Sequence, residues 1–463
     1  MMNPRVPQRL VDALLCAVLA VVASVPDALA QGGPAPAAAA PPPAVLFRDV
    51  RVFDGRRATL SGPVDVLVRG PTIARIAASP MAVDGAAPTT VIDGKGRTLM
   101  PGLIDNHWHT MMASTPLPVL LEADVGYLNL LAAAQAEATL MRGFTTVRDL
   151  GGPSFALKRA IDEGLVVGPR VYPSGAMISI TGGHGDFRSR SDLPRQLGGP
   201  LTRLELIGGS FVADSPDEVR VRAREQLLLG ASQIKLTAGG GVASPHSPLD
   251  IATFDEDELR AAVRAAGSWG TYVGVHAYTP VAIQRAIAAG IKVIEHGHLM
   301  DDASAKAIAD NGLWLSFQPF VDDGHTPPLA PANLIRLQQV RTGTERTIEL
   351  VKKYKLKMAL GTDILFSAAG AARQGEVLTT MTRWYSAPEV LAMATSTNGE
   401  LLKLSGPRDP YPGKIGVVEE GALADLLLVD GNPLENLRLV EDPARHFVVI
   451  MKDGRVFKNT LAK

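Results

Sequence analysis

The sequence predicts an α/β fold, a (β/α)8 TIM barrel with a small β-sandwich domain formed from both ends of the chain. Between residues 101 and 405, eight short apolar runs alternate with helix-like segments, and eight βα units imply a closed parallel barrel. At 45–100 and 406–463, apolar and polar residues alternate between Gly, Pro and Asp turns, as in a β-domain. A length of 463 residues suits a large barrel with an accessory domain.

The first 44 residues are expected to lie outside these domains. Two arginines precede an apolar run over 10–25, and Ala-Leu-Ala at 28–30 provides small residues for cleavage, so the pattern predicts a signal peptide over 1–30. The run is short for a membrane span, which needs about 20 residues; an uncleaved anchor is the alternative. Residues 31–44 are a Pro/Ala-rich linker. We expect a periplasmic or secreted protein that has no membrane association after signal removal.

Composition restricts the chemistry. The single cysteine, Cys16, lies in the predicted signal, so the mature chain would have no disulfide, thiolate ligand or cysteine nucleophile. Any metal site must therefore use His, Asp, Glu or Lys. The formal net charge of −1 gives no electrostatic reason to expect a nucleic acid or an anionic lipid as partner.

The predicted strands of the barrel are, in chain order, GLIDNHWH, FTTVRDLG, RVYPSG, SQIKLTAGG, TYVGVHAY, IKVIEHG, LWLSFQP and KMALGTD. Helices are expected between them, for example over 215–230 and 255–267. These two segments begin with Ser-Pro-Asp and Asp-Glu and end with Gly, which are good start and stop signals. After about Gly406 strands return, in KIGVVEEGALADLLLVDG and FVVIMKDGRVF.

Metal-binding residue types stand at the ends of four predicted strands, where a barrel carries its chemistry. His107 and His109 end the first run, and their i, i+2 spacing puts both rings on one face. His276 ends the fifth run, His296 the sixth and Asp363 the eighth. Each residue alone is typical of a structural role, but their joint placement predicts a metal site. Imidazole and carboxylate ligands suit zinc and similar divalent ions.

Lys235 lies within the fourth run, which is otherwise apolar. Burying an ammonium group costs several kcal/mol unless the group is paired. An ion pair inside the barrel is one explanation of this lysine. The other depends on a family resemblance.

Seven segments resemble the amidohydrolase superfamily, in particular its imidazolonepropionase-like and Xaa-Pro dipeptidase-like branch: PGLIDNHWH, GFTTVRDLGG, SGAMISITGGHGD, IKLTAGGGV, VHAYTPVAIQRAIAAGIKVIEHGH, ALGTD and GALADLLLVDGNPL. The resemblance covers almost the whole mature chain. It implies two divalent ions, taken to be Zn²⁺, and these ligands: His107 and His109 for the first ion, His276 and His296 for the second, a CO₂-derived carbamate on Lys235 bridging both, and Asp363 on the first ion and the bridging water.

The implied activity is hydrolysis of an amide bond by metal-activated hydroxide. Asp363 takes the proton from the nucleophile and then passes it to the leaving nitrogen, as general base and acid. A dipeptide such as Xaa-Pro, or an N-acyl amino acid, is the expected substrate, and a mycotoxin-like N-acyl phenylalanine is a further possibility. Small-molecule or peptide substrates are thus the expected partners, and family members are often homo-oligomers.

Three further residues are candidates for contact with the substrate. His184, in the loop TGGHGDFRSR, matches a family position that can contact the substrate carbonyl or oxyanion; a surface loop histidine is the alternative. Arg188 can pair with a substrate carboxylate or be exposed to solvent. Tyr278 can hydrogen-bond the substrate or pack on the rim. Glu295 and His298 flank His296 and can support that ligand or simply pack.

Other activities stay open. A lactone or cyclic-amide hydrolase can use the same centre, whereas Lys235 argues against a mononuclear deaminase. A non-catalytic binding or assembly protein is disfavoured because every expected ligand is present. The segment after Asp363, ILFSAAGAARQGE, departs from many relatives, which puts in doubt any transfer of a relative's substrate.

Overall fold

The computed structural model describes residues 43–82, 88–325 and 329–462. The predicted signal peptide, and the linker up to residue 42, lie outside these ranges. Among the helices described, none is long and apolar enough to cross a membrane.

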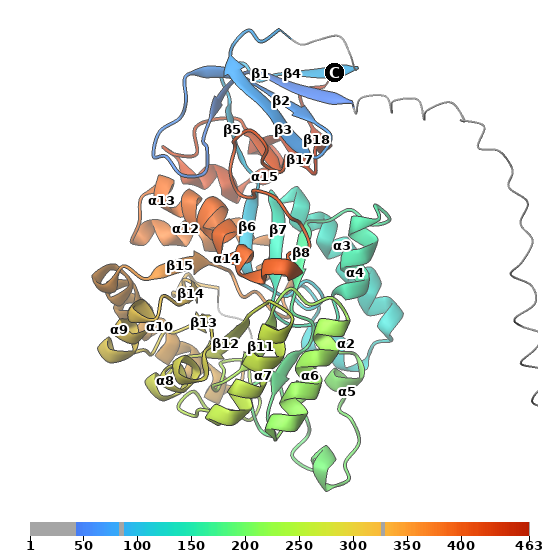
Figure 1. Cartoon of the computed structure of the whole chain (residues 1–463), viewed down its shortest axis with the longest axis vertical. Helices are drawn as coiled ribbons and strands as arrows, with labels where there is room; N and C mark the ends of the chain where they lie inside the picture. The colour runs from blue at the N-terminus through green and yellow to red at the C-terminus, as the bar shows by residue number, and fades with distance from the viewer. Residues whose placement is uncertain (1–42, 83–87, 326–328, 463) are drawn as a thin grey trace, which may run out of the picture. The chain divides into compact units, whose positions relative to one another are not determined.

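Strands from both ends of the chain join in one sheet, drawn in blue and red in Figure 1. Its order is β18-β17-β16-β5-β1-β2-β3, with β4 paired to β1. The ends meet where β16 (Leu426–Val429) runs antiparallel to β5 (Thr98–Pro101). The other strands are β1 (Ala44–Val52), β2 (Pro63–Arg69), β3 (Thr72–Ala78), β4 (Thr89–Asp93), β17 (Phe447–Lys452) and β18 (Arg455–Asn459). This strand pairing does not show whether the sheet folds into two packed layers, so the β-sandwich stays a prediction.

All eight runs predicted for the barrel contain strands: β6 (Leu103–Trp108), β7 (Phe144–Asp149), β8 (Arg170–Pro173), β11 (Ile234–Thr237), β12 (Val273–Ala277), β13 (Val293–His296), β14 (Trp314–Phe317) and β15 (Lys357–Leu360). All their residues except Lys357 are buried, because helices cover a parallel sheet on its outer face. Two short strands, β9 (Met177–Ser179) and β10 (Ser210–Val212), were not predicted.

Every ladder among these strands is parallel, which confirms the α/β class. Within the described residues the ladders form two sheets, β6-β7-β8 and β10-β9-β11-β12-β13-β14-β15, and not one closed barrel. At one break, the side chain of Gln233 donates to Tyr172 O over 2.9 Å. At the other, Asp363 N donates to His107 O over 2.8 Å. A few isolated hydrogen bonds, which at the first break include Ser232 N to Pro173 O over 2.8 Å, therefore take the place of a ladder at both breaks.

Helices separate the parallel strands, as expected. The two segments singled out form α6 (Pro216–Leu228) and α7 (Glu256–Ser268), capped by the side chains of Ser215 and Asp255. The other helices are α2 (Leu117–Glu122), α3 (Val125–Met141), α4 (Phe155–Asp162), α5 (Arg203–Leu206), α8 (Pro280–Ala289), α9 (Asp302–Asp310), α10 (Pro331–Tyr354), α11 (Ala368–Ala372), α12 (Gln374–Thr379), α13 (Ala387–Ala392), α14 (Asn398–Leu402) and α15 (Pro443–His446).

The largest buried apolar cluster fixes the strands that carry the candidate ligands. Leu236, Val275, Ile294 and Leu315 belong to it, one from each of four neighbouring strands. A close-packed interior resists displacement. The polar residues at the carboxyl ends of these strands are therefore held on a rigid base.

Candidate metal centre

Three predicted ligands meet at the carboxyl ends of β6 and β15. Asp363 Oδ1 lies 3.3 Å from His107 Nε2 and 3.2 Å from His109 Nε2. One donor atom from each of the three lies within 4.8 Å of the others. Asp363 has a left-handed backbone, with a φ of 51°, a conformation that is uncommon outside glycine. The bond from its N–H to His107 O holds that backbone beside β6.

The other two histidines adjoin this cluster. The ring centroids of His276 and His296 are 4.3 Å apart, and that of His296 is 5.0 Å from that of His107. His296 Nδ1 lies 4.0 Å from Asp363 Oδ2. The structure thus brings together all four histidines and the aspartate that the sequence singled out.

Lys235 lies on β11, one strand from His276, and is 3% exposed. No described residue forms a salt bridge with it, so the ion pair considered from the sequence is not seen in the described part of the chain. Burial lowers the pKa of this lysine to about 8, although the charges of Glu295 and Asp363 act in the opposite direction. A lysine with this pKa is about one-tenth free amine at pH 7, far more than a lysine with the ordinary pKa near 10.4.

Each of the four histidines directs one ring nitrogen at a protein acceptor. The contacts are His107 Nδ1 to Glu295 Oε2 (3.2 Å), His109 Nδ1 to Gly151 O (3.4 Å), His276 Nε2 to Gly240 O (2.7 Å) and His296 Nδ1 to Gln318 Oε1 (2.6 Å). At His276 and His296 the acceptor requires an N–H, so the opposite nitrogen keeps its lone pair, whereas the opposite nitrogens of His107 and His109 both face Asp363 Oδ1. His296 Nε2 shows this directly, because it is buried with no hydrogen-bond partner.

The pKa values of three of these histidines also favour neutral rings that can bind a metal ion. Burial, reinforced by neighbouring cationic groups, lowers the pKa of His107, His276 and His296 well below 6.5. The rings are therefore neutral at physiological pH, and neutral imidazole is the form that binds a metal. The donor set fits divalent metal ions without further rearrangement of the protonation state.

A buried ion pair between Arg148 and Glu295 contacts His107. Arg148 and Glu295 are both fully buried, and Arg148 Nη2 donates to Glu295 Oε1 over 2.7 Å. Arg148 also donates to Tyr272 Oη over 3.0 Å. Glu295 was a candidate from the sequence, whereas Arg148 and Gln318 were not predicted. Arg148 had the same signal as Lys235, a charged residue inside an apolar run.

Two of the three predicted substrate-facing residues lie at this centre. The ring of His184 is 4.3 Å from that of His276, and its Nδ1 is buried without a hydrogen-bond partner. Burial lowers the pKa of His184 to about 3. Tyr278 is 2% exposed and stacks on His296 at a centroid distance of 4.9 Å. The packing of Tyr278 is therefore internal and not on an exposed rim.

Arg188 is already paired within its own loop. Its Nε donates to Asp186 Oδ1 over 2.9 Å, and its Nη2 donates to Oδ2 of the same carboxylate over 2.5 Å. The Arg188 guanidinium lowers the pKa of Asp186, against the effect of burial. A role for Arg188 in binding a substrate carboxylate stays a prediction, and Asp186 would compete for it.

Residues 98–458 match the model of the amidohydrolase family. The chain belongs to this family. Proteins of the family bind divalent metals, and the cluster of His107, His109 and Asp363 is a candidate site for one. This amidohydrolase is therefore a hydrolase that acts on carbon–nitrogen bonds.

Several known proteins are similar to this amidohydrolase in sequence or structure. Over 330 residues it is 30% identical to the ochratoxinase of Aspergillus niger, an alignment that covers 69% of this chain and 66% of the relative. A solved amidohydrolase is 37% identical, with a TM-score of 0.82 over 90% of this chain and 100% of the other. A prolidase in complex with N-methylphosphonate-L-proline is 32% identical, with the same TM-score and coverage.

Proposed function

We propose that this amidohydrolase is an exported two-metal enzyme that hydrolyses an amide bond in a dipeptide, such as Xaa-Pro, or in an N-acyl amino acid. The single observation that carries the proposal is the shared pattern of the four histidines. Each directs one ring nitrogen at a protein acceptor; the opposite nitrogens of His107 and His109 both face Asp363 Oδ1, and that of His296 is buried without a hydrogen-bond partner. Export rests only on the sequence of residues 1–30.

The residues that would hold two zinc ions divide into two groups. His107, His109 and Asp363 would hold the first ion, and His276 and His296 the second. Lys235, as a carbamate, would bridge them and so replace a buried cation by an anionic ligand. When bound, the two ions would lower the pKa of a water molecule and polarise the scissile carbonyl.

Asp363 is suited to move the proton during hydrolysis. Its side chain is only 15% exposed, and its Oδ1 contacts two histidines while Oδ2 faces a third. In the proposed mechanism this carboxylate accepts a proton from the attacking water and delivers it to the leaving nitrogen. His184, with its unpartnered Nδ1, is placed to hydrogen-bond the substrate carbonyl as negative charge develops on its oxygen.

The relatives support the choice of substrate. A prolidase and a Xaa-Pro dipeptidase are among the solved structures similar to this chain, at 32% and 26% identity. They favour a bond to a proline nitrogen. The similarity to ochratoxinase favours the alternative, an amide of a more apolar amino acid. The same centre could also open a lactone or a cyclic amide, which is the second candidate function.

A substrate panel with matched histidine variants tests the proposal. Xaa-Pro dipeptides, other dipeptides, N-acyl amino acids and lactones would be assayed with zinc and with a chelator. We expect amide hydrolysis that the chelator abolishes and that His276→Gln reduces at least about 100-fold. His325→Gln is the control, because the side chain of His325 is 61% exposed. Turnover of lactones alone would favour the second function, and chelator-resistant hydrolysis would contradict the metal mechanism.

A further inference from the structure

Helix α10 is hydrogen-bonded to a loop that contacts His184 beside the candidate metal centre. Arg336 Nη1 donates to Ser244 O over 2.8 Å and to Gly241 O over 3.3 Å. Asn333, three residues earlier and hence on the same helix face, donates to Ser244 O over 3.1 Å and also to Val242 O. These bonds fix the backbone of 241–244 against the beginning of α10.

The same loop contacts the centre through His184. Gly241 has no room for a side chain, since a Cβ there would lie 2.2 Å from His184 Nδ1. His184 in turn lies against His276, a predicted ligand. Arg336 therefore lies next to the residues that face the substrate.

Among the described residues, Arg336 has no anionic partner, unlike other arginines in this region. Arg188 is paired with Asp186, and Arg373 with Asp323 and Glu376. In the described part of the chain Arg336 forms no salt bridge, and its hydrogen bonds use only Nη1. The residue is half-buried. A half-buried guanidinium with unused donors is complementary to a carboxylate, which it can bind through two parallel hydrogen bonds.

We propose that Arg336 binds the free α-carboxylate of the substrate, so that this enzyme requires an unblocked C-terminal carboxylate. The inference rests on the proposed amide hydrolysis and makes it specific. It transfers to Arg336 the role that the sequence suggested for Arg188. Substrates with a neutral end, such as amino-acid amides, would leave the Arg336 charge unpaired in a partly desolvated site and would react poorly.

Paired substrates test this assignment. An N-acyl amino acid or Xaa-Pro dipeptide would be compared with its C-terminal carboxamide in the wild-type enzyme and in Arg336→Met. We expect the variant to lower kcat/KM for the carboxylate about 10- to 100-fold, mainly by raising KM, the loss typical of a hydrogen bond to a charged group. Its kcat/KM for the carboxamide should fall no further than in Asn333→Ala, because both variants lose hydrogen bonds to the loop 241–244. Arg336→Lys should recover part of the loss.

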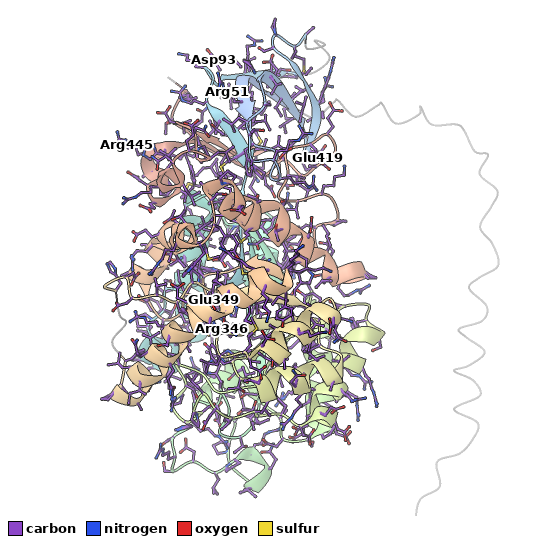
Figure 2. The ribbon with its side chains drawn as sticks, turned by 90° about the vertical axis from the view of Figure 1, so that its left-hand side faces the viewer. Arg51, Asp93, Arg346, Glu349, Glu419 and Arg445 are labelled. Atoms are coloured by element: carbon purple, nitrogen blue, oxygen red, sulfur yellow. The ribbon has the colours of Figure 1, made fainter. Side chains whose placement is uncertain are left out.

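Two controls separate charge from loop anchoring. Asn333→Ala removes a bond to the same loop without changing charge, and should affect acid and amide alike. Arg346→Met removes an equal charge from an exposed part of α10, where Arg346 pairs with Glu349 over 3.1 Å (Figure 2), and should change neither substrate. Equal losses for acid and amide in Arg336→Met would overturn the assignment.

Failure of the proposed function would be visible separately. If the wild-type enzyme hydrolyses neither substrate of any pair, calorimetric binding of N-acetyl-L-proline and its carboxamide replaces turnover. Binding of the acid that is weakened about tenfold or more in Arg336→Met, with a change for the amide no larger than that in Asn333→Ala, would support the carboxylate site. Equal binding of the acid to wild type and variant, or no binding to the wild type, would overturn it.

Discussion

Gln318 Oε1 lies 2.6 Å from His296 Nδ1, so the amide oxygen of Gln318 fixes which nitrogen of His296 carries the proton. The bond leaves Nε2 as the unpartnered, buried lone pair. His296 also has a left-handed backbone, with a φ of 78°. Contacts within the protein therefore set both the backbone and the tautomer of this histidine.

Gln318→Leu should weaken metal binding at the second ion site and lower kcat/KM about 10- to 100-fold, the range typical when the hydrogen-bond partner of a ligand is removed. The reason is that His296 loses the acceptor that orients its ring. Metal titration of the chelated protein and steady-state kinetics measure the effect. Gln318→Glu keeps an acceptor for Nδ1 and should recover part of the affinity. Wild-type affinity in Gln318→Leu would contradict the proposed role.

Arg148→Met should lower stability by about 3–5 kcal/mol, because it leaves the carboxylate of Glu295 buried without its cation. The double variant Arg148→Met/Glu295→Met should recover much of that loss, since a buried ion pair is often replaceable by apolar groups. Shifts in the midpoint of chemical denaturation, measured on metal-free protein, give this comparison.

The same double variant should still bind metal poorly. It removes the carboxylate that lies 3.2 Å from His107 Nδ1, so the tautomer of His107 is no longer fixed. In the double variant, stability should thus recover while metal affinity stays low. Recovery of both would show that Glu295 acts only as the counter-ion of Arg148.

Asp363→Asn should reduce kcat by at least about 100-fold, because an amide cannot accept and return the proton. Asparagine is the appropriate substitution, since a φ of 51° is adopted more readily by Asn than by most other side chains. Circular dichroism should therefore show an unchanged fold. Single-turnover kinetics with the best substrate of the panel measure the chemical step, and an unchanged kcat would exclude proton transfer by Asp363.

Much of the fold and the site could be predicted from the sequence. Buried parallel strands appear as short apolar runs, and His107, His276 and Asp363 stood out because polar residues ended such runs. The residues that were missed act through contacts distant in sequence. Gln318 is 22 positions from His296, and Arg336 lies on a helix whose pattern gives no indication of the loop it contacts. Pairing of Arg188 with Asp186 was equally invisible, since only the loop conformation brings them together.

Metal content of Lys235→Met, compared with wild type, tests the central claim most directly. Both proteins would be purified in the presence of zinc and bicarbonate and analysed for metal per chain, with amide hydrolysis measured on the same samples. The account predicts about two ions per wild-type chain, fewer in the variant, and loss of hydrolysis with the lost metal. One ion per wild-type chain, with metal content and hydrolysis both preserved in Lys235→Met, would contradict a two-metal centre bridged by this lysine.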